Sequence, residues 1–101
     1  MAAKIYINAS AETTSEKIQL RAVDLPASIT AKGLAGVETV DIKMSQDDGA
    51  TSFDLYYGGT QVQLTATSNQ TTIDGPGTFI LYKNTTAGTV VVGVHSDTLG
   101  L

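Results

Sequence analysis

The segment Gln61-Val-Gln-Leu-Thr-Ala-Thr67 alternates polar and apolar side chains at every second position. Successive side chains of a β-strand point to opposite faces of a sheet, so this spacing predicts a strand with one buried and one solvated face. The preceding pair Gly58-Gly59 can supply the positive φ angles that a tight hairpin turn needs. These residues predict antiparallel β-structure.

Similar alternation, in a chain rich in β-branched residues, extends in both directions from this segment. It predicts an all-β fold, a small β-sandwich in a single domain, with a small β-barrel as the alternative. Turn signals separate the strands at Asp47-Asp48-Gly49, at Gly75-Pro76-Gly77 and at Asn84–Gly88, the last of which is expected to close a final hairpin. The expected strands are 3–8, 16–23, 27–32, 37–45, 52–57, 60–67, 71–74, 78–83 and 89–95.

A chain of 101 residues fits one domain. Residues 16–95 are expected to form the sandwich, residues 1–15 an N-terminal arm or edge strand, and residues 96–101 a C-terminal tail. The terminal segments contain few large apolar residues, which predicts that they become ordered mainly on assembly.

Charged residues make up 16% of the chain, and the net charge is −4. An acidic chain whose six basic residues are scattered singly is not expected to bind nucleic acid. The longest apolar runs are far too short to cross a bilayer, and the N-terminus lacks the apolar core of a signal peptide, so no membrane association or export is expected. Cysteine is absent, which suits a reducing cytoplasm.

Catalytic patterns are weak, so the chain is not expected to be an enzyme or to need a cofactor. His95, Ser96 and Asp97 are adjacent, but an extended backbone would turn Ser96 away from the other two. Asp47, Asp48 and Asp54 could gather around calcium, although the spacing does not match a calcium loop and Asp-Asp-Gly is favoured in turns. No metal site is predicted.

Three runs form a familiar succession: Gly36-Val-Glu-Thr-Val-Asp-Ile-Lys-Met-Ser-Gln-Asp-Asp-Gly49, Gly75-Pro-Gly-Thr-Phe79 and Thr86-Ala-Gly-Thr-Val-Val-Val-Gly-Val94. Together with Leu64-Thr-Ala-Thr-Ser-Asn69, they resemble small structural proteins of tailed bacteriophages, over about residues 27–95. The resemblance implies an immunoglobulin-like sandwich that decorates or cements a capsid by binding the major capsid protein. It also implies a place on the capsid exterior of a virion assembled in the cytoplasm of the bacterial host.

A second class of function stays open beside the virion structural protein. It is a carbohydrate- or receptor-binding β module for host attachment, in a tail or fibre. Adjacent Tyr56 and Tyr57 are its weak support, since only one of them can face a given ligand. Whether the chain forms a homo-oligomer also stays open.

The expected final hairpin predicts an interface. Its all-valine face must be core, and the immunoglobulin-like corner at Gly77-Thr-Phe79 places Phe79 and Leu81 inward. The outward apolar residues would then form the contact patch with the capsid: Ile80, Tyr82 and Val91. The alternative is a strand that faces solvent or is covered by the N-terminal segment.

Overall fold

The computed structural model describes residues 2–97, which form β-strands and one short 3-10 helix. The strands are β1 (Ala2–Ala9), β2 (Thr13–Thr14), β3 (Ile18–Leu20), β4 (Ala27–Lys32), β5 (Thr39–Ser45), β6 (Phe53–Asp54), β7 (Tyr56–Tyr57), β8 (Thr60–Gln61), β9 (Gln63–Thr65), β10 (Gln70–Ile73), β11 (Gly77–Lys83) and β12 (Val90–Ser96), with the helix η1 (Ala22–Asp24) between β3 and β4.

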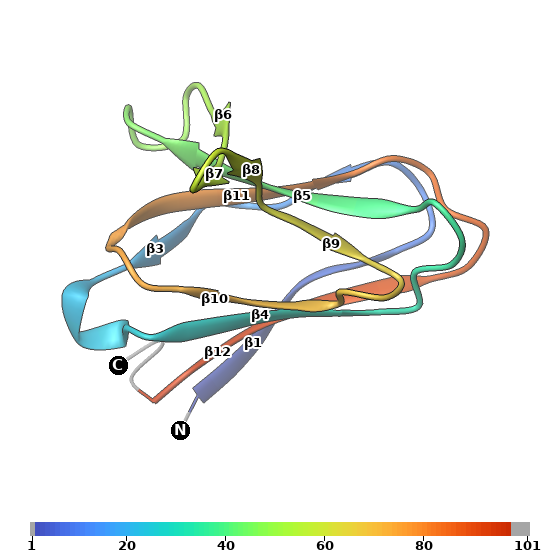
Figure 1. Ribbon diagram of the computed structural model, residues 1–101, viewed down its shortest axis with the longest axis horizontal. Coiled ribbons are helices and arrows are strands. Elements are labelled where there is room, and N and C mark those ends of the chain that lie inside the picture. The colour runs from blue at the N-terminus through green and yellow to red at the C-terminus, as the bar shows by residue number, and fades with distance from the viewer. Residues whose placement is uncertain (1, 98–101) are drawn as a thin grey trace.

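Two antiparallel sheets lie face to face as two layers (Figure 1). The first, here called the β1 sheet, has the order β1-β12-β4-β10. The second, the β5 sheet, is built on β11 and β5, with β2 and β3 on the outer side of β11 and β6 and β9 on the outer side of β5. Strands β7 and β8 form a separate small hairpin. The predicted all-β sandwich is therefore confirmed.

The strand order is that of a jelly roll. With β2 and β3 counted as one strand, the eight main strands in chain order form sheets 1-8-3-6 and 2-7-4-5. Consecutive strands thus lie in opposite sheets except β5 and β9, which pair with each other. This double-sheet winding, two Greek keys closed on one another, differs from the immunoglobulin order, in which the first two strands share a sheet.

The core follows the alternation seen in the sequence. Val90, Val92 and Val94 of β12 are fully buried, and Phe79 and Leu81 of β11 belong to the same cluster. β5 and β4 contribute their alternate residues in the same way. The inward placement predicted for these two faces is confirmed.

The predicted final hairpin is wrong, because β11 and β12 lie in opposite sheets. Their apolar faces look toward each other across the core, so residues 84–89 cross from one layer to the other. Lys83 holds this crossing in place: its buried ammonium lies 2.8–3.1 Å from the carbonyl oxygens of Ser10, Ala11 and Asn84 and the hydroxyl of Thr86.

The N-terminal segment forms an edge strand, one of the two alternatives that the sequence left open. β1 pairs along its length with β12, with one irregularity between Ile5 and Ile7. Ile7 is 1% exposed and packs in the core. At the other terminus, Ser96 ends β12, and residues 98–101 of the predicted C-terminal tail lie outside the described residues.

Candidate binding surface on the β5–β9 insertion

A long insertion, residues 46–62, joins β5 to β9 and carries β6 and the β7–β8 hairpin. Figure 1 shows these three short strands projecting above one end of the sandwich. The connections that cross from one sheet to the other are much shorter. Long loops on a rigid scaffold often carry binding functions, so this insertion is the candidate binding site.

The insertion begins with a turn that Asp47 closes. Its carboxylate accepts hydrogen bonds from the Thr51 amide at 2.7 Å, the Thr51 hydroxyl at 2.6 Å and the Ser45 hydroxyl at 2.9 Å. The bonds from Thr51 lower the pKa of Asp47. These contacts fix the direction in which the chain leaves β5.

Neighbouring Asp48 ties the same turn to β3. Its backbone has a φ of 59°, and its carboxylate lies 2.9 Å from the Lys17 ammonium and 3.0 Å from the Gln19 amide. The hydrogen bond and charge of Lys17 lower the pKa of Asp48. Asp54, the third carboxylate considered for calcium, pairs instead with Lys43 at 3.2 Å. The contacts of Asp47 and Asp48 are those of a turn, the interpretation that the sequence favoured over calcium.

The β7–β8 hairpin is tightly turned and anchored at its base. Gly58 and Gly59 have φ angles of 60° and 85°, the two positive values of a type I′ turn, as the Gly-Gly pair predicted. Below it, Leu55 and Val62 are each 8% exposed and join the core. Leu55 donates its amide hydrogen to the Ile42 carbonyl at 3.1 Å, and Val62 donates to the Leu55 carbonyl at 2.7 Å.

Three aromatic side chains are exposed on this anchored insertion. Phe53 is 63% exposed, Tyr56 57% and Tyr57 43%. Aromatic residues are enriched at protein interfaces because they bury large areas at a small cost in side-chain entropy. The sequence indicated only that Tyr56 and Tyr57 diverge. It gave no signal that all three rings lie outside the core.

Tyr57 borders a groove that Tyr56 does not line. The groove has a volume of about 290 Å³ and lies between the β8–β9 segment and β10. It is lined by Tyr57, Thr60, Gln61, Val62, Gln63, Ser68, Gln70 and Thr71. The alternation of Gln61 and Gln63 with core residues, visible in the sequence, is what presents amide groups to it.

The three predicted interface residues do not form one patch. Ile80 and Tyr82 lie on the outer face of the β5 sheet, whereas Val91 lies on the outer face of the β1 sheet, across the core. Ile80 is only 7% exposed. The patch as predicted is therefore wrong, because it required β11 and β12 to be neighbours in one sheet.

Tyr82 also has polar surroundings. Its hydroxyl lies within hydrogen-bond distance of the Glu12 carboxylate and the Asn84 side chain, and the Lys43 ammonium is 5.6 Å from its ring centre. The bond to Glu12 raises the pKa of Tyr82. On the outer face of the β1 sheet, which also carries Val91, there is a mostly apolar depression of about 240 Å³ that Ile5, Gly93 and others line.

His95, Ser96 and Asp97 all line one cavity of about 280 Å³ at the end of β12, but they do not have the geometry of a triad. Ser96 is 2% exposed and alternates with His95 across the β1 sheet, so their side chains lie on opposite faces. His95 borders the apolar depression beside Gly93. This divergence is the one expected from extended backbone.

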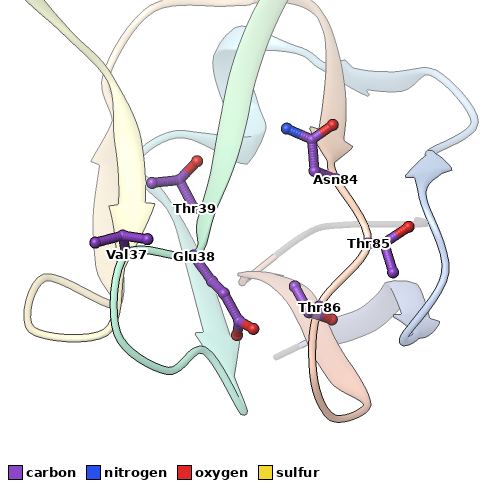
Figure 2. A pocket seen from close by; sticks show the side chains of 6 residues that line it. All are labelled: Val37, Glu38, Thr39, Asn84, Thr85 and Thr86. Carbon is purple, nitrogen blue, oxygen red and sulfur yellow. The ribbon is translucent and has the colours of Figure 1, made fainter.

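A cavity of about 210 Å³ lies between the start of β5 and the loop after β11 (Figure 2). Its one ionisable side chain, Glu38, is already engaged: it accepts hydrogen bonds from the Ala35 amide at 2.9 Å and the Ala87 amide at 2.8 Å. These bonds lower the pKa of Glu38, that from Ala87 most. The cavity thus marks a cross-link between two loops.

Among the described residues, no helix is long and apolar enough to cross a membrane. The same residues hold no group of three or more histidine, cysteine or acidic side chains placed to bind a metal ion. No protein-family model, curated protein or solved structure matches the chain. The geometry of the insertion is therefore the main guide to function.

Proposed function

We propose that the chain is a non-enzymatic structural protein of a virion, a capsid decoration or cement protein that binds the major capsid protein and stabilises its lattice. The observation that carries the proposal is the pair of exposed aromatic residues, Phe53 and Tyr56, on an insertion fastened to the core. We call this pair the aromatic contact.

An anchored aromatic contact suits attachment to a protein surface. Burying two large rings supplies apolar area, and a preformed loop loses little conformational entropy when it binds. The turn bonds of Asp47 and the core positions of Leu55 and Val62 provide that preorganisation. The low content of charged residues, 16%, also lowers the desolvation cost of covering the surface.

The fold is compatible with this role, because viral capsid proteins are among the users of the jelly roll. Lectin domains use it as well, so the fold by itself assigns neither function. The virion assignment rests on the resemblance to phage structural proteins and on the aromatic contact.

The test is occupancy of capsids by a double variant, Phe53→Ser with Tyr56→Ser. Interface aromatics typically contribute about 1–2 kcal/mol each, so we expect occupancy at limiting protein to fall at least about tenfold while the fold is retained. Ile5→Ser is the matched control, since Ile5 is 56% exposed but lies on the β1 sheet. A folded double variant that binds capsids as well as the parent chain would overturn the proposed contact.

A further inference from the structure

The groove beside Tyr57 is lined by uncharged residues, most of which carry a polar side chain. Glutamine, threonine and serine side chains supply its polar groups: Gln61, Gln63, Gln70, Thr60, Thr71 and Ser68. Each amide offers two donors and an acceptor, and each hydroxyl offers both functions. The groove can therefore satisfy a ligand that carries several neutral donors and acceptors.

One of the amides is held in a fixed orientation. The Gln63 side-chain nitrogen donates to an Asp41 carboxylate oxygen at 2.6 Å. This contact crosses from β9 to β5, so it is part of the sheet and does not depend on a ligand. A fixed amide contributes to recognition at a smaller entropic cost than a free one.

Tyr57 gives the groove an aromatic wall. The residue is 43% exposed, and it directly precedes the type I′ turn at Gly58-Gly59. A half-exposed ring beside hydrogen-bonding groups suits a ligand with one apolar face and a polar rim. A sugar ring has this form, with C–H groups on its face and hydroxyls around its edge.

Other ligand classes fit less well. A phosphate or carboxylate group would call for lysine or arginine, and neither lines the groove. A purely apolar ligand would bury the glutamine amides without partners, at a cost of about 1–3 kcal/mol each. The volume, about 290 Å³, is at the small end of ligand sites, which suits one or two sugar units.

We infer that this groove binds a neutral saccharide, with Tyr57 against the apolar face of one sugar ring and Gln61, Gln63 and Gln70 bonded to its hydroxyls. The site is separate from the aromatic contact and does not depend on capsid attachment. A protein could carry both, holding a particle with one surface and a glycan with the other.

The experiment is a nuclear magnetic resonance titration of the full chain with neutral probes: the methyl glycosides of glucose, galactose, mannose and N-acetylglucosamine, and disaccharides of each. At least one should give saturable amide shifts in the millimolar range, confined to residues 57, 60–63 and 68–71. Methyl glucuronide, which carries a carboxylate, should bind more weakly than the neutral sugar of the same ring. Absence of saturable shifts with every neutral probe, or shifts located elsewhere, would overturn the inference.

Matched variants separate this site from the rest of the surface. Tyr57→Ala should weaken binding at least about tenfold, while Ile5→Ala, at an exposed residue of the β1 sheet, should bind the saccharide as the parent chain does. The same spectra report whether each variant is folded. If Tyr57→Ala loosens the hairpin, Gln70→Ala on β10 provides the second test and should also weaken binding. If Tyr57→Ala and Gln70→Ala are both folded and both bind the saccharide with the affinity of the parent chain, the assignment is contradicted.

Discussion

Lys83 shows at the scale of one residue how this sandwich is closed. Its side chain is 0% exposed, and its ammonium lies near four neutral oxygens from two loops that are more than seventy residues apart in sequence. A buried ammonium is tolerated only where such oxygens replace its hydration shell. Lys83 therefore joins the β1–β2 connection to the crossing after β11.

We expect Lys83→Met to destabilise the chain by about 1–3 kcal/mol, because the Asn84 carbonyl oxygen would lose its donor. The carbonyl oxygens of Ser10 and Ala11 would keep only neutral donors, from Thr86 and Thr13. Urea unfolding followed by tyrosine fluorescence would measure the change. Lys32→Met, at an exposed lysine, is the control and should shift stability by less than about 0.5 kcal/mol. Equal losses in the two variants would show that Lys83 has no special role.

Glu38 predicts a pH dependence. Its pKa is lowered by the hydrogen bonds from Ala87 and Ala35, so the unfolded chain takes up a proton at a higher pH than the folded chain does. Stability from Glu38 is fully present above its ordinary pKa of 4.5 and is lost as the pH falls through the lower folded-state value. We expect the urea midpoint to decline below about pH 4.5.

The variant Glu38→Gln isolates this contribution. The glutamine side chain has a single oxygen, so it cannot accept the amide hydrogens of both Ala35 and Ala87 as the two carboxylate oxygens do. The urea midpoint at pH 7 should therefore fall, and its decline in acid should become shallower. Asp47 and Asp48, whose pKa values are also lowered, would account for the acid sensitivity that remains. A decline identical to that of the parent chain would show that Glu38 makes no such contribution.

At the scale of elements, the β7–β8 hairpin depends on its two glycines. We expect Gly58→Ala with Gly59→Ala to cost about 1 kcal/mol per position, because alanine is strained at positive φ. Gly75→Ala is the control, since a Cβ at Gly75 meets nothing within 4 Å and its φ lies outside the left-handed range.

Hydrogen exchange would locate the effect of the glycine variant. The Val62 amide, bonded to the Leu55 carbonyl at 2.7 Å, should exchange faster, while amides of β12 should keep their protection. Uniform acceleration through the whole core would mean that the hairpin is not a separate unit, and unchanged exchange at Val62 would mean that the turn does not hold it.

The elements differ in how far the sequence determines them. Alternation identified the buried faces of β11 and β12, and the glycine pairs located turns. The alternation could not show which sheet a strand joins, because the inward faces of two packed sheets carry the same pattern of alternating apolar residues. The alternation therefore predicts one surface for Ile80, Tyr82 and Val91, although only two of them share a sheet.

The candidate site was harder to predict than the fold. Phe53 and Tyr56 are aromatic residues of a kind that is often buried in protein cores, and only the tertiary position of the insertion leaves them exposed. The groove beside Tyr57 joins residues of β8 and β9 to residues of β10, which belong to different sheets. Such a site depends on the winding of the jelly roll, which local patterns do not specify.

At the scale of the whole molecule, the jelly roll unites these features. Its winding places the long insertion at one end of the sandwich and the loops joined by Glu38 and Lys83 elsewhere (Figure 1). Substitutions in the binding surface therefore need not disturb the contacts that join these loops. In the proposed function, this scaffold attaches to a capsid lattice through the aromatic contact of Phe53 and Tyr56.

The proposed function is tested most plainly by quantitative mass spectrometry of purified virions of a phage whose genome carries this sequence, which measures the amount of this chain against the major capsid protein. Attachment to the lattice predicts a fixed ratio, one copy or one small oligomer per repeating unit, that persists through washing. Absence from the particle, or a few copies that remain with isolated tails, would contradict it.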